Sequence, residues 1–140
     1  MTVTLMEKIT VDATVENLQQ VIDFATEQLE LHECPMKTVM QSELVIEEIF
    51  VNIASYAYQP EIGSATFCIE FEENPNAVVM TFIDGGKPYN PLEKVDPDTT
   101  LDIEERDIGG LGIFLVKKNV DDIAYSYEGG KNILTIKKFF

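Results

Sequence analysis

The spacing of apolar residues changes at Ala65, and that change restricts the fold more than any other feature. Between residues 18 and 58, apolar side chains recur every three to four positions, the spacing of helices with one buried face. From Ala65 to Glu72, apolar and polar residues alternate, as they do in a half-buried strand. The sequence therefore predicts a layer of helices packed on a sheet.

Turn and capping residues locate the remaining elements. Thr14 is expected to cap the first helix, which ends near Leu31, and Pro35 suits the first turn of the second helix, at 36–58. Strands are expected at 5–11, 65–71, 77–83, 123–127 and 133–139, and a third helix opens after Gly110. We expect an α/β fold, an α+β two-layer sandwich whose mixed, mostly antiparallel sheet is covered on one face by three helices. One domain spans 1–140, with its core at about 5–139.

The charge balance limits the possible partners. The chain has 25 acidic and 10 basic residues, a net charge of −15, so nucleic acid is not an expected partner. A bound phosphate would have to meet backbone N–H groups and a metal ion instead. No stretch reaches the roughly 18–20 apolar residues of a membrane span, and the N-terminus lacks a signal sequence. We therefore expect a cytoplasmic protein with no membrane partner, whose Cys34 and Cys68 are reduced and structural.

Three short motifs carry candidate chemistry, and the first lies in the second expected helix. Glu48 and Asn52 are one turn apart on one face, with Cβ atoms about 5–6 Å from each other. Asparagine is a mediocre helix former, so its place beside apolar residues needs a reason. A solvated polar face is the alternative interpretation of this pair taken alone.

The second and third motifs contain glycine. Asp84 ends an apolar strand and leads directly into Gly85-Gly86, where a carboxylate could accept a hydrogen bond from an adenine amino group. Gly109, Gly110 and Gly112 stand at the start of an apolar helix, where free N–H groups and the helix dipole favour phosphate. A plain turn and a closely packed helix start are the respective alternatives.

Motifs of other nucleotide-binding classes are missing from the sequence. It contains no G-x-x-x-x-G-K-[ST] loop and neither an H-R-D nor a D-F-G motif, which excludes P-loop NTPases and eukaryotic-type protein kinases. The segment 84–110 holds three prolines and four glycines and lacks a sustained period. Loops this long are usually functional, so we expect a lid at 91–108.

Taken in order, the three motifs resemble those of the GHKL (Bergerat-fold) ATPase superfamily, and within it the anti-sigma-factor serine/threonine kinases. The resemblance covers about residues 5–139. The matching segments are the N-box, Glu48 to Asn52, the first glycine box, Asp84-Gly85-Gly86, and the second, Gly109-Gly110-Leu111-Gly112. Tyr56 stands where this subfamily often has histidine, and Pro88-Tyr89-Asn90-Pro91 replaces a second glycine in the first box.

The resemblance implies a role for each matching residue. Asn52 would coordinate Mg²⁺ and Glu48 would be the general base for an attacking hydroxyl. Asp84 would hold the adenine amino group, with Gly86 beside it. The glycines Gly109, Gly110 and Gly112, with Leu111 between them, would wrap the phosphates. Thr135, on the last strand, matches a threonine that helps to fix adenine in many relatives.

The function implied is an ATP- and Mg²⁺-dependent serine/threonine kinase. Its substrate would be a small STAS-type anti-sigma-factor antagonist, and a sigma factor would be a second partner. Relatives dimerise through the sheet side, so a homodimer is expected. The alternative is an ATP-sensing module that binds a partner without transferring phosphate. Glu48 favours the kinase, because nucleotide sensing alone needs no base.

Overall fold

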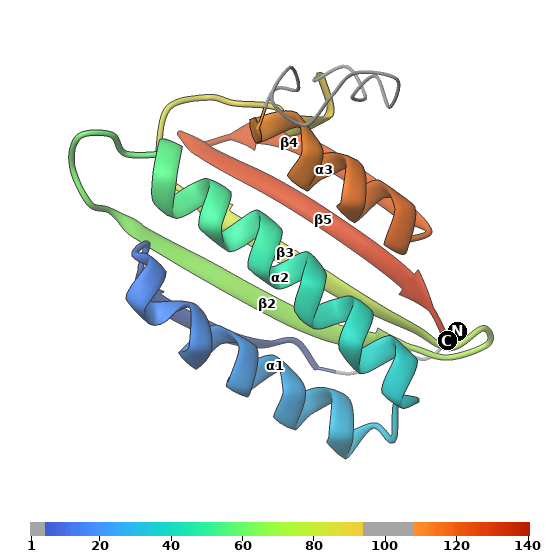
Figure 1. Cartoon of the computed structure of the whole chain (residues 1–140). Coiled ribbons are helices and arrows are strands. Elements are labelled where there is room, and N and C mark those ends of the chain that lie inside the picture. The colour runs from blue at the N-terminus through green and yellow to red at the C-terminus, as the bar shows by residue number, and fades with distance from the viewer. Residues whose placement is uncertain (1–4, 94–107) are drawn as a thin grey trace.

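The computed structural model describes residues 5–93 and 108–140. Within them the chain forms two layers, a sheet and three α-helices (Figure 1). The helices are α1 (Leu18–Leu31), α2 (Met36–Tyr56) and α3 (Ile108–Asn119), and short 3₁₀ turns lie at η1 (Val15–Asn17) and η2 (Pro91–Glu93). The strands are β1 (Glu7–Asp12), β2 (Ser64–Glu72), β3 (Ala77–Asp84), β4 (Asp122–Glu128) and β5 (Lys131–Phe139). The predicted two-layer α/β architecture is confirmed.

The sheet has the strand order β1-β2-β3-β5-β4, so β3 lies at its centre. All four neighbouring pairs of strands are antiparallel, which corrects the expected mixed sheet. The last helix crosses over between β3 and β4, and the chain then returns as a hairpin whose second strand pairs with β3. At the hairpin turn Gly129 and Gly130 have φ angles of 59° and 77°, the left-handed region that favours glycine.

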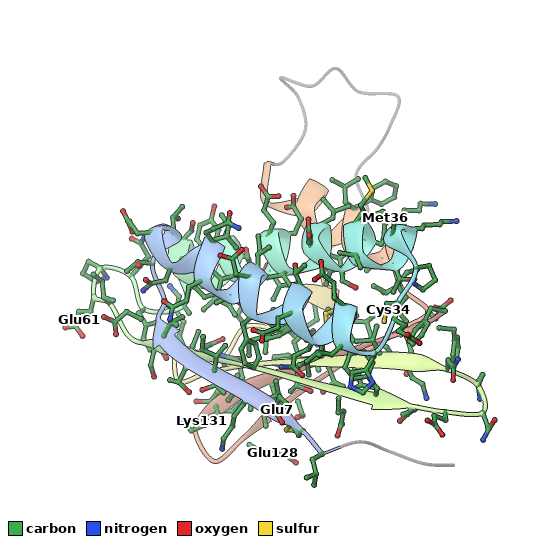
Figure 2. The ribbon with its side chains drawn as sticks, turned by 90° about the horizontal axis from the view of Figure 1, so that it is seen from below. Glu7, Cys34, Met36, Glu61, Glu128 and Lys131 are labelled. Carbon is green, nitrogen blue, oxygen red and sulfur yellow. The ribbon has the colours of Figure 1, made fainter. Side chains whose placement is uncertain are left out.

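The three helices cover one face of the sheet, and the core fills the space between the two layers (Figures 1 and 2). Helix α1 buries Val21, Ala25 and Leu29, which recur at the spacing of one helical face. Helix α2 buries a longer stripe, in which Ile46 and Phe50 are almost completely enclosed. The strands contribute the alternate residues of their inner face, Phe67, Ile69, Phe71, Val78, Met80, Phe82, Leu134 and Ile136.

Several predicted boundaries shift. Thr14 lies at the N-cap of the 3₁₀ turn η1 rather than of α1, and its side chain makes no capping hydrogen bond. Helix α3 begins at Ile108, before the position expected from the glycines, so Gly109 and Gly110 lie inside its first turn. Most of the expected lid, 91–108, lies outside the described residues. Of the described helices, none is long and apolar enough to span a membrane.

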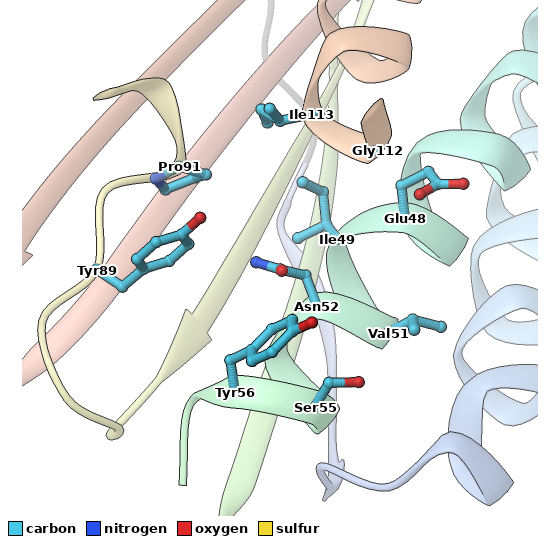
Figure 3. Close-up of a pocket in the computed structure, with 10 residues that line it drawn as sticks. All are labelled: Glu48, Ile49, Val51, Asn52, Ser55, Tyr56, Tyr89, Pro91, Gly112 and Ile113. Carbon is cyan, nitrogen blue, oxygen red and sulfur yellow. The ribbon is translucent and has the colours of Figure 1, made fainter. Parts of the chain in front are cut away.

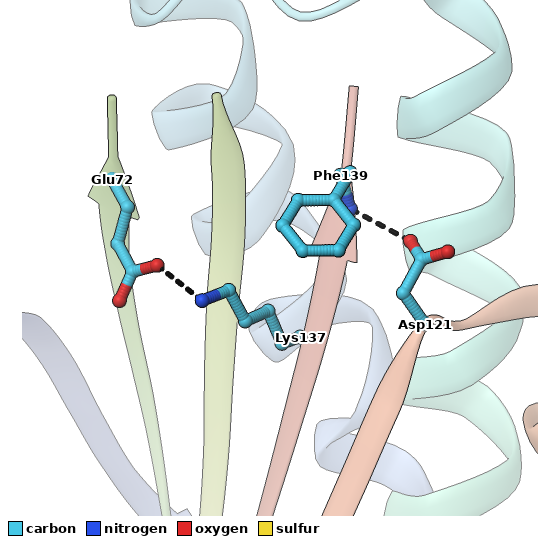
Figure 4. Close-up of polar contacts among 4 residues, drawn as sticks. All are labelled: Glu72, Asp121, Lys137 and Phe139. Atoms are coloured by element: carbon cyan, nitrogen blue, oxygen red, sulfur yellow. Dashed lines mark hydrogen bonds and ion pairs between the residues drawn. The ribbon is translucent and has the colours of Figure 1, made fainter. Parts of the chain in front are cut away.

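The face of the sheet away from the helices is held at one end by polar contacts (Figure 4). Lys137 on β5 forms a 2.6 Å ion pair with Glu72 on β2, across the central strand. The Phe139 N–H donates to Asp121 Oδ2 at 2.8 Å, joining the end of β5 to the start of β4. The two contacts join β2 to β5 and β5 to the start of β4, so they align these strands at one end of the sheet.

Both cysteines are free thiols. Cys34 lies in the connection between α1 and α2 (Figure 2). Burial raises its pKa to about 11, so the thiol stays protonated at neutral pH. Burial also raises the pKa of Cys68. The charge of Lys8 lowers this pKa and the charge of Glu70 raises it, both by less than burial does. Neither thiol has the lowered pKa of a reactive cysteine, in keeping with a structural role.

One buried polar atom allows a test of the packing. Ser42 on α2 is fully enclosed, and its Oγ makes no hydrogen bond within the described part of the chain. A buried hydroxyl without a partner costs about 1–3 kcal/mol, so Ser42→Ala should raise the free energy of unfolding by about 1 kcal/mol. Denaturant titration of both proteins measures this difference. A lower unfolding midpoint in the variant would contradict it.

Candidate functional site

Helix α2 presents one polar face to a cavity that α3 and the 84–93 segment enclose (Figure 3). The cavity has a volume of about 300 Å³. Glu48, Asn52 and Tyr56 follow one another at four-residue intervals and all line it, because side chains at this spacing share one side of a helix. Its other lining residues are Ile49, Val51, Ser55, Tyr89, Pro91, Gly112 and Ile113.

A second cavity of about 270 Å³ adjoins the first. Asn52, Tyr56 and Tyr89 line both, so these three side chains stand at the junction of the two spaces. The second cavity is otherwise lined by Ile53, Ala57, Lys87 and Asn132. The two spaces together form one elongated site, with Glu48 and the start of α3 at one end and the β3–β5 end at the other.

Gly112 brings α3 directly against Glu48. A Cβ atom at position 112 would lie 2.6 Å from Glu48 Oε2, which is closer than real Cβ contacts come. Glycine here therefore leaves the space that the carboxylate occupies. Burial raises the pKa of Glu48, and the neighbouring charge of Glu47 raises it further. A carboxylate with a raised pKa is a stronger base, which suits it to accept a proton.

Gly86 brings the loop after β3 equally close to the end of α2. A Cβ atom there would lie 2.3 Å from the Ala57 carbonyl oxygen, which belongs to the backbone and cannot move aside easily. The adjacent Lys87 N–H donates to the same oxygen at 3.1 Å. The glycine thus allows the loop to dock on the helix that carries Asn52 and Tyr56.

Asp84 and Asn132 form a buried polar pair beside the second cavity, with only 6% and 7% of their surfaces exposed. They face each other in the β3–β5 register. Asp84 Oδ1 accepts hydrogen bonds from the Gly86 N–H at 2.9 Å and from Asn132 Nδ2 at 3.0 Å. Asn132 also lines the cavity, so this pair connects the sheet to the ligand space.

The structure brings together most of the residues that the sequence singled out. Glu48, Asn52 and Gly112 line the first cavity, and Asp84 and Gly86 lie beside the second. Gly109, Gly110 and Leu111 belong to the first turn of α3, the same helix that brings Gly112 to the cavity.

Thr135 is an exception and corrects the sequence assignment. It alternates with the buried Leu134 and Ile136, and it pairs in register with Thr81. Alternate residues of a strand point to opposite faces, so Thr135 lies on the face of the sheet away from the helices and the cavities. Asn132, which sequence reasoning missed, occupies the position opposite Asp84. The hairpin turn at Gly129-Gly130 fixes the register of β5 against β4 but not against β3, so no local signal in the sequence placed Asn132 opposite Asp84.

Comparison with known proteins shows the family to which the chain belongs. The family model of the histidine kinase-like ATPase domain matches residues 11–138, and the chain belongs to this family. The matched range contains both cavities and all three motifs.

Within this family, the chain is similar to individual serine-protein kinases. The serine-protein kinase RsbW of Bacillus thuringiensis (strain Al Hakam) is 27% identical over 97 residues, which cover 68% of this chain and 61% of the relative. RsbW of Bacillus mycoides (strain KBAB4) is 27% identical over 99 residues, with the same coverage. The chain therefore matches somewhat less than two thirds of the length of these kinases.

A solved structure supports the fold. The RsbU and RsbW domains of Rv1364c from Mycobacterium tuberculosis superpose with a TM-score of 0.63 at 15% identity, covering 97% of this chain and 33% of the other. At this identity the likeness concerns the fold alone.

Adjacent glycines allow a test of the loop docking. Gly86→Ala should lower the free energy of unfolding by about 1–3 kcal/mol, because its Cβ would overlap the Ala57 backbone. Gly85→Ala is the matched control, since its Cβ would meet only Tyr58 Oη at 3.4 Å and Lys131 Nζ at 3.9 Å. Denaturant titrations of both variants measure the difference. Equal losses in the two variants would mean that Ala57 does not restrict position 86.

Proposed function

We propose that this protein is an ATP- and Mg²⁺-dependent serine/threonine kinase of the anti-sigma-factor type. The observation that carries the proposal is the placement of Glu48 and Asn52 on one helix face, in one cavity, against Gly112 at the start of α3. This arrangement offers a base, an oxygen ligand and a helix N-terminus within a single enclosed space. Membership of an ATPase-domain family supports ATP as the ligand.

The elongated site suggests how ATP would lie. The adenine would occupy the second cavity, where Asp84 accepts a hydrogen bond from its amino group and Gly86 keeps the loop close. The phosphates would lie in the first cavity, at the start of α3, where Gly109, Gly110 and Leu111 offer N–H groups of the first helical turn and Gly112 leaves room for close approach. Backbone N–H groups can hold the triphosphate despite the net charge of −15.

Mg²⁺ fits the residues of this site only as a companion of ATP. The described residues contain no group of three or more His, Cys, Asp and Glu side chains that could hold a metal by itself. The side-chain oxygen of Asn52 lies at the junction of both cavities and is a hard ligand of the kind that Mg²⁺ prefers. Asn52 would hold the ion together with phosphate oxygens, and the ion would neutralise phosphate charge.

Glu48 would act as the general base. A serine hydroxyl of the substrate would lose its proton to Glu48 as its oxygen attacks the γ-phosphorus, and ADP would leave. The raised pKa of Glu48 favours this proton transfer. The similarity to RsbW kinases supports serine as the acceptor residue.

The partners are those that the resemblance of the three motifs to anti-sigma-factor kinases implies. The substrate would be a STAS-domain anti-sigma-factor antagonist and a second partner would be a sigma factor, in the cytoplasm and with the kinase as a homodimer. The acidic net charge supports proteins rather than nucleic acid as partners.

Nucleotide binding can be tested by thermal unfolding. ATP with Mg²⁺ should stabilise the wild type by about 2.7 kcal/mol at a hundred-fold excess over Kd, because the ligand binds only the folded state. Asn52→Ala should lose most of the Mg²⁺-dependent part of this shift and keep the shift that ATP gives with a chelator. Differential scanning fluorimetry measures both. A wild type that is not stabilised by millimolar Mg-ATP would refute the nucleotide site.

Glu48→Gln tests phosphate transfer. The amide keeps the size and polarity of the carboxylate but removes the basic oxygen, so phosphotransfer should fall by about 10²–10⁴-fold while Mg-ATP affinity stays nearly unchanged. The assay follows labelled γ-phosphate onto a STAS-type partner, alongside nucleotide titration. Glu27→Gln is the matched control, since this exposed side chain on α1 lines neither cavity and does not contribute to the raised pKa of Glu48.

Two other results would reassign the site. A wild type that captures the partner only with ATP present, yet transfers no label, would make the protein an ATP sensor. Loss of Mg-ATP binding in the Glu48→Gln variant would assign Glu48 to the nucleotide-binding shell instead of to proton transfer.

A further inference from the structure

Asn132 makes an unusually complete set of contacts for one side chain. Its Nδ2 donates to Asp84 Oδ1 at 3.0 Å and to the Lys87 carbonyl at 2.9 Å. Its Oδ1 accepts from the Tyr89 N–H at 3.0 Å and from the Tyr125 hydroxyl. One amide therefore joins three parts of the fold: the end of β3, the loop that follows it and strand β4.

These contacts also fix which way the amide points. The two groups facing Oδ1 are hydrogen-bond donors, and the three facing Nδ2, which include the Gly86 carbonyl at 3.5 Å, are acceptors. A flipped amide would place like groups against each other on both sides. The NH₂ group is therefore held toward Asp84, and only an amide of this length supplies both the donor and the acceptor.

The orientation of Asn132 has a consequence for Asp84. Two donors occupy Oδ1, the Gly86 N–H and Asn132 Nδ2. Within residues 5–93 and 108–140, no hydrogen bond to Oδ2 is found, and the one buried side-chain atom without a partner is Ser42 Oγ. Oδ2 thus keeps contact with solvent and can still accept a hydrogen bond.

We propose that Asn132 sets the base specificity of the site, by holding Asp84 with Oδ1 satisfied and Oδ2 open to the 6-amino group of a purine. The inference rests on the proposed nucleotide site and adds a specificity-determining residue to it. Asn132 acts through Asp84, so it is a positioning residue. Its exposed part lines the second cavity, which places the pair beside the space assigned to the base.

The chemistry of the purine edge explains the discrimination. An ionised carboxylate only accepts hydrogen bonds, so it pairs with the amino group of adenine and opposes the carbonyl oxygen of a 6-oxopurine. A hydrogen bond to a charged group is worth about 1.5–3 kcal/mol, which corresponds to roughly ten- to hundred-fold in affinity. A carboxylate free to rotate, or one that binds a proton, would lose this preference.

The test compares ATP with inosine triphosphate, which carries an oxygen in place of the 6-amino group. The wild type should bind ATP at least about ten-fold more tightly in calorimetric titrations with Mg²⁺. In Asn132→Asp the acceptors for Tyr89 and Tyr125 remain, but a second carboxylate replaces the donor to Asp84. When both carboxylates are ionised they repel each other and no donor holds Oδ1, so Asp84 loses its fixed orientation and the preference should fall to about two-fold or less.

Three further variants separate specificity from folding. Asn132→Ser adds no charge and is too short to reach Asp84, so it should also lose the preference even where Asn132→Asp folds poorly. Tyr125→Phe removes a donor to Asn132 Oδ1 and leaves the bond to Asp84, so it should keep the wild-type ratio. Asn76→Asp adds the same charge in the exposed turn before β3, at the other end of that strand, and should also keep it.

The outcomes distinguish this inference from the proposed function. A preference for ATP that persists in both Asn132 variants would overturn the role of Asn132, with the nucleotide site intact. Equal wild-type affinity for the two nucleotides would also overturn it, because Asp84 would then not read the base. A wild type that binds neither nucleotide would overturn the site itself, and this inference with it.

Discussion

Helix α2 contributes buried apolar side chains to the core and polar side chains to the cavity, and the rest of the structure depends on this double role. Its apolar stripe, which includes Ile46 and Phe50, is buried against the sheet. Its polar face carries Glu48, Asn52 and Tyr56 into the cavity. A rigid helix anchored by a large buried area is a stable support for polar groups that must keep their places.

The two glycine-containing segments depend on this helix in turn. Gly112 brings α3 against Glu48, and Gly86 brings the loop after β3 against Ala57. In both cases the absent side chain is the reason for the close approach, and no unusual backbone angle is involved, because the positive φ glycines of the described residues are Gly129 and Gly130. Two close approaches near the site thus rest on glycine, one against the Glu48 carboxylate and one against the Ala57 backbone.

The net negative charge of the chain is compatible with phosphate binding by backbone N–H groups. With a net charge of −15, an array of basic side chains is not the means by which such a protein would hold a triphosphate. Peptide N–H groups at the start of a helix carry a fixed positive field that does not depend on net charge. The raised pKa of Glu48 reflects the same enclosed setting, since burial is the larger of its two causes.

The sequence by itself determined the layers, the motifs and the class of ligand. The change of apolar spacing at Ala65 predicted helices on a sheet. A half-buried helix has an apolar residue every three to four positions, whereas a half-buried strand has one at every second position. The spacing of Glu48 and Asn52 placed them on one helix face, because local geometry alone sets that relation. Local patterns are sufficient for features of this kind.

Tertiary structure decided what local patterns cannot encode. The sheet is antiparallel throughout because β5 lies between β3 and β4 and runs opposite to both, and no short-range signal specifies where the β4–β5 hairpin docks. The register of β5 against β3 put Asn132 opposite Asp84 and turned Thr135 to the other face, since a shift of one residue exchanges the two faces of a strand. Partners that meet across 48 residues are set by packing and strand register, and only the folded chain brings them together.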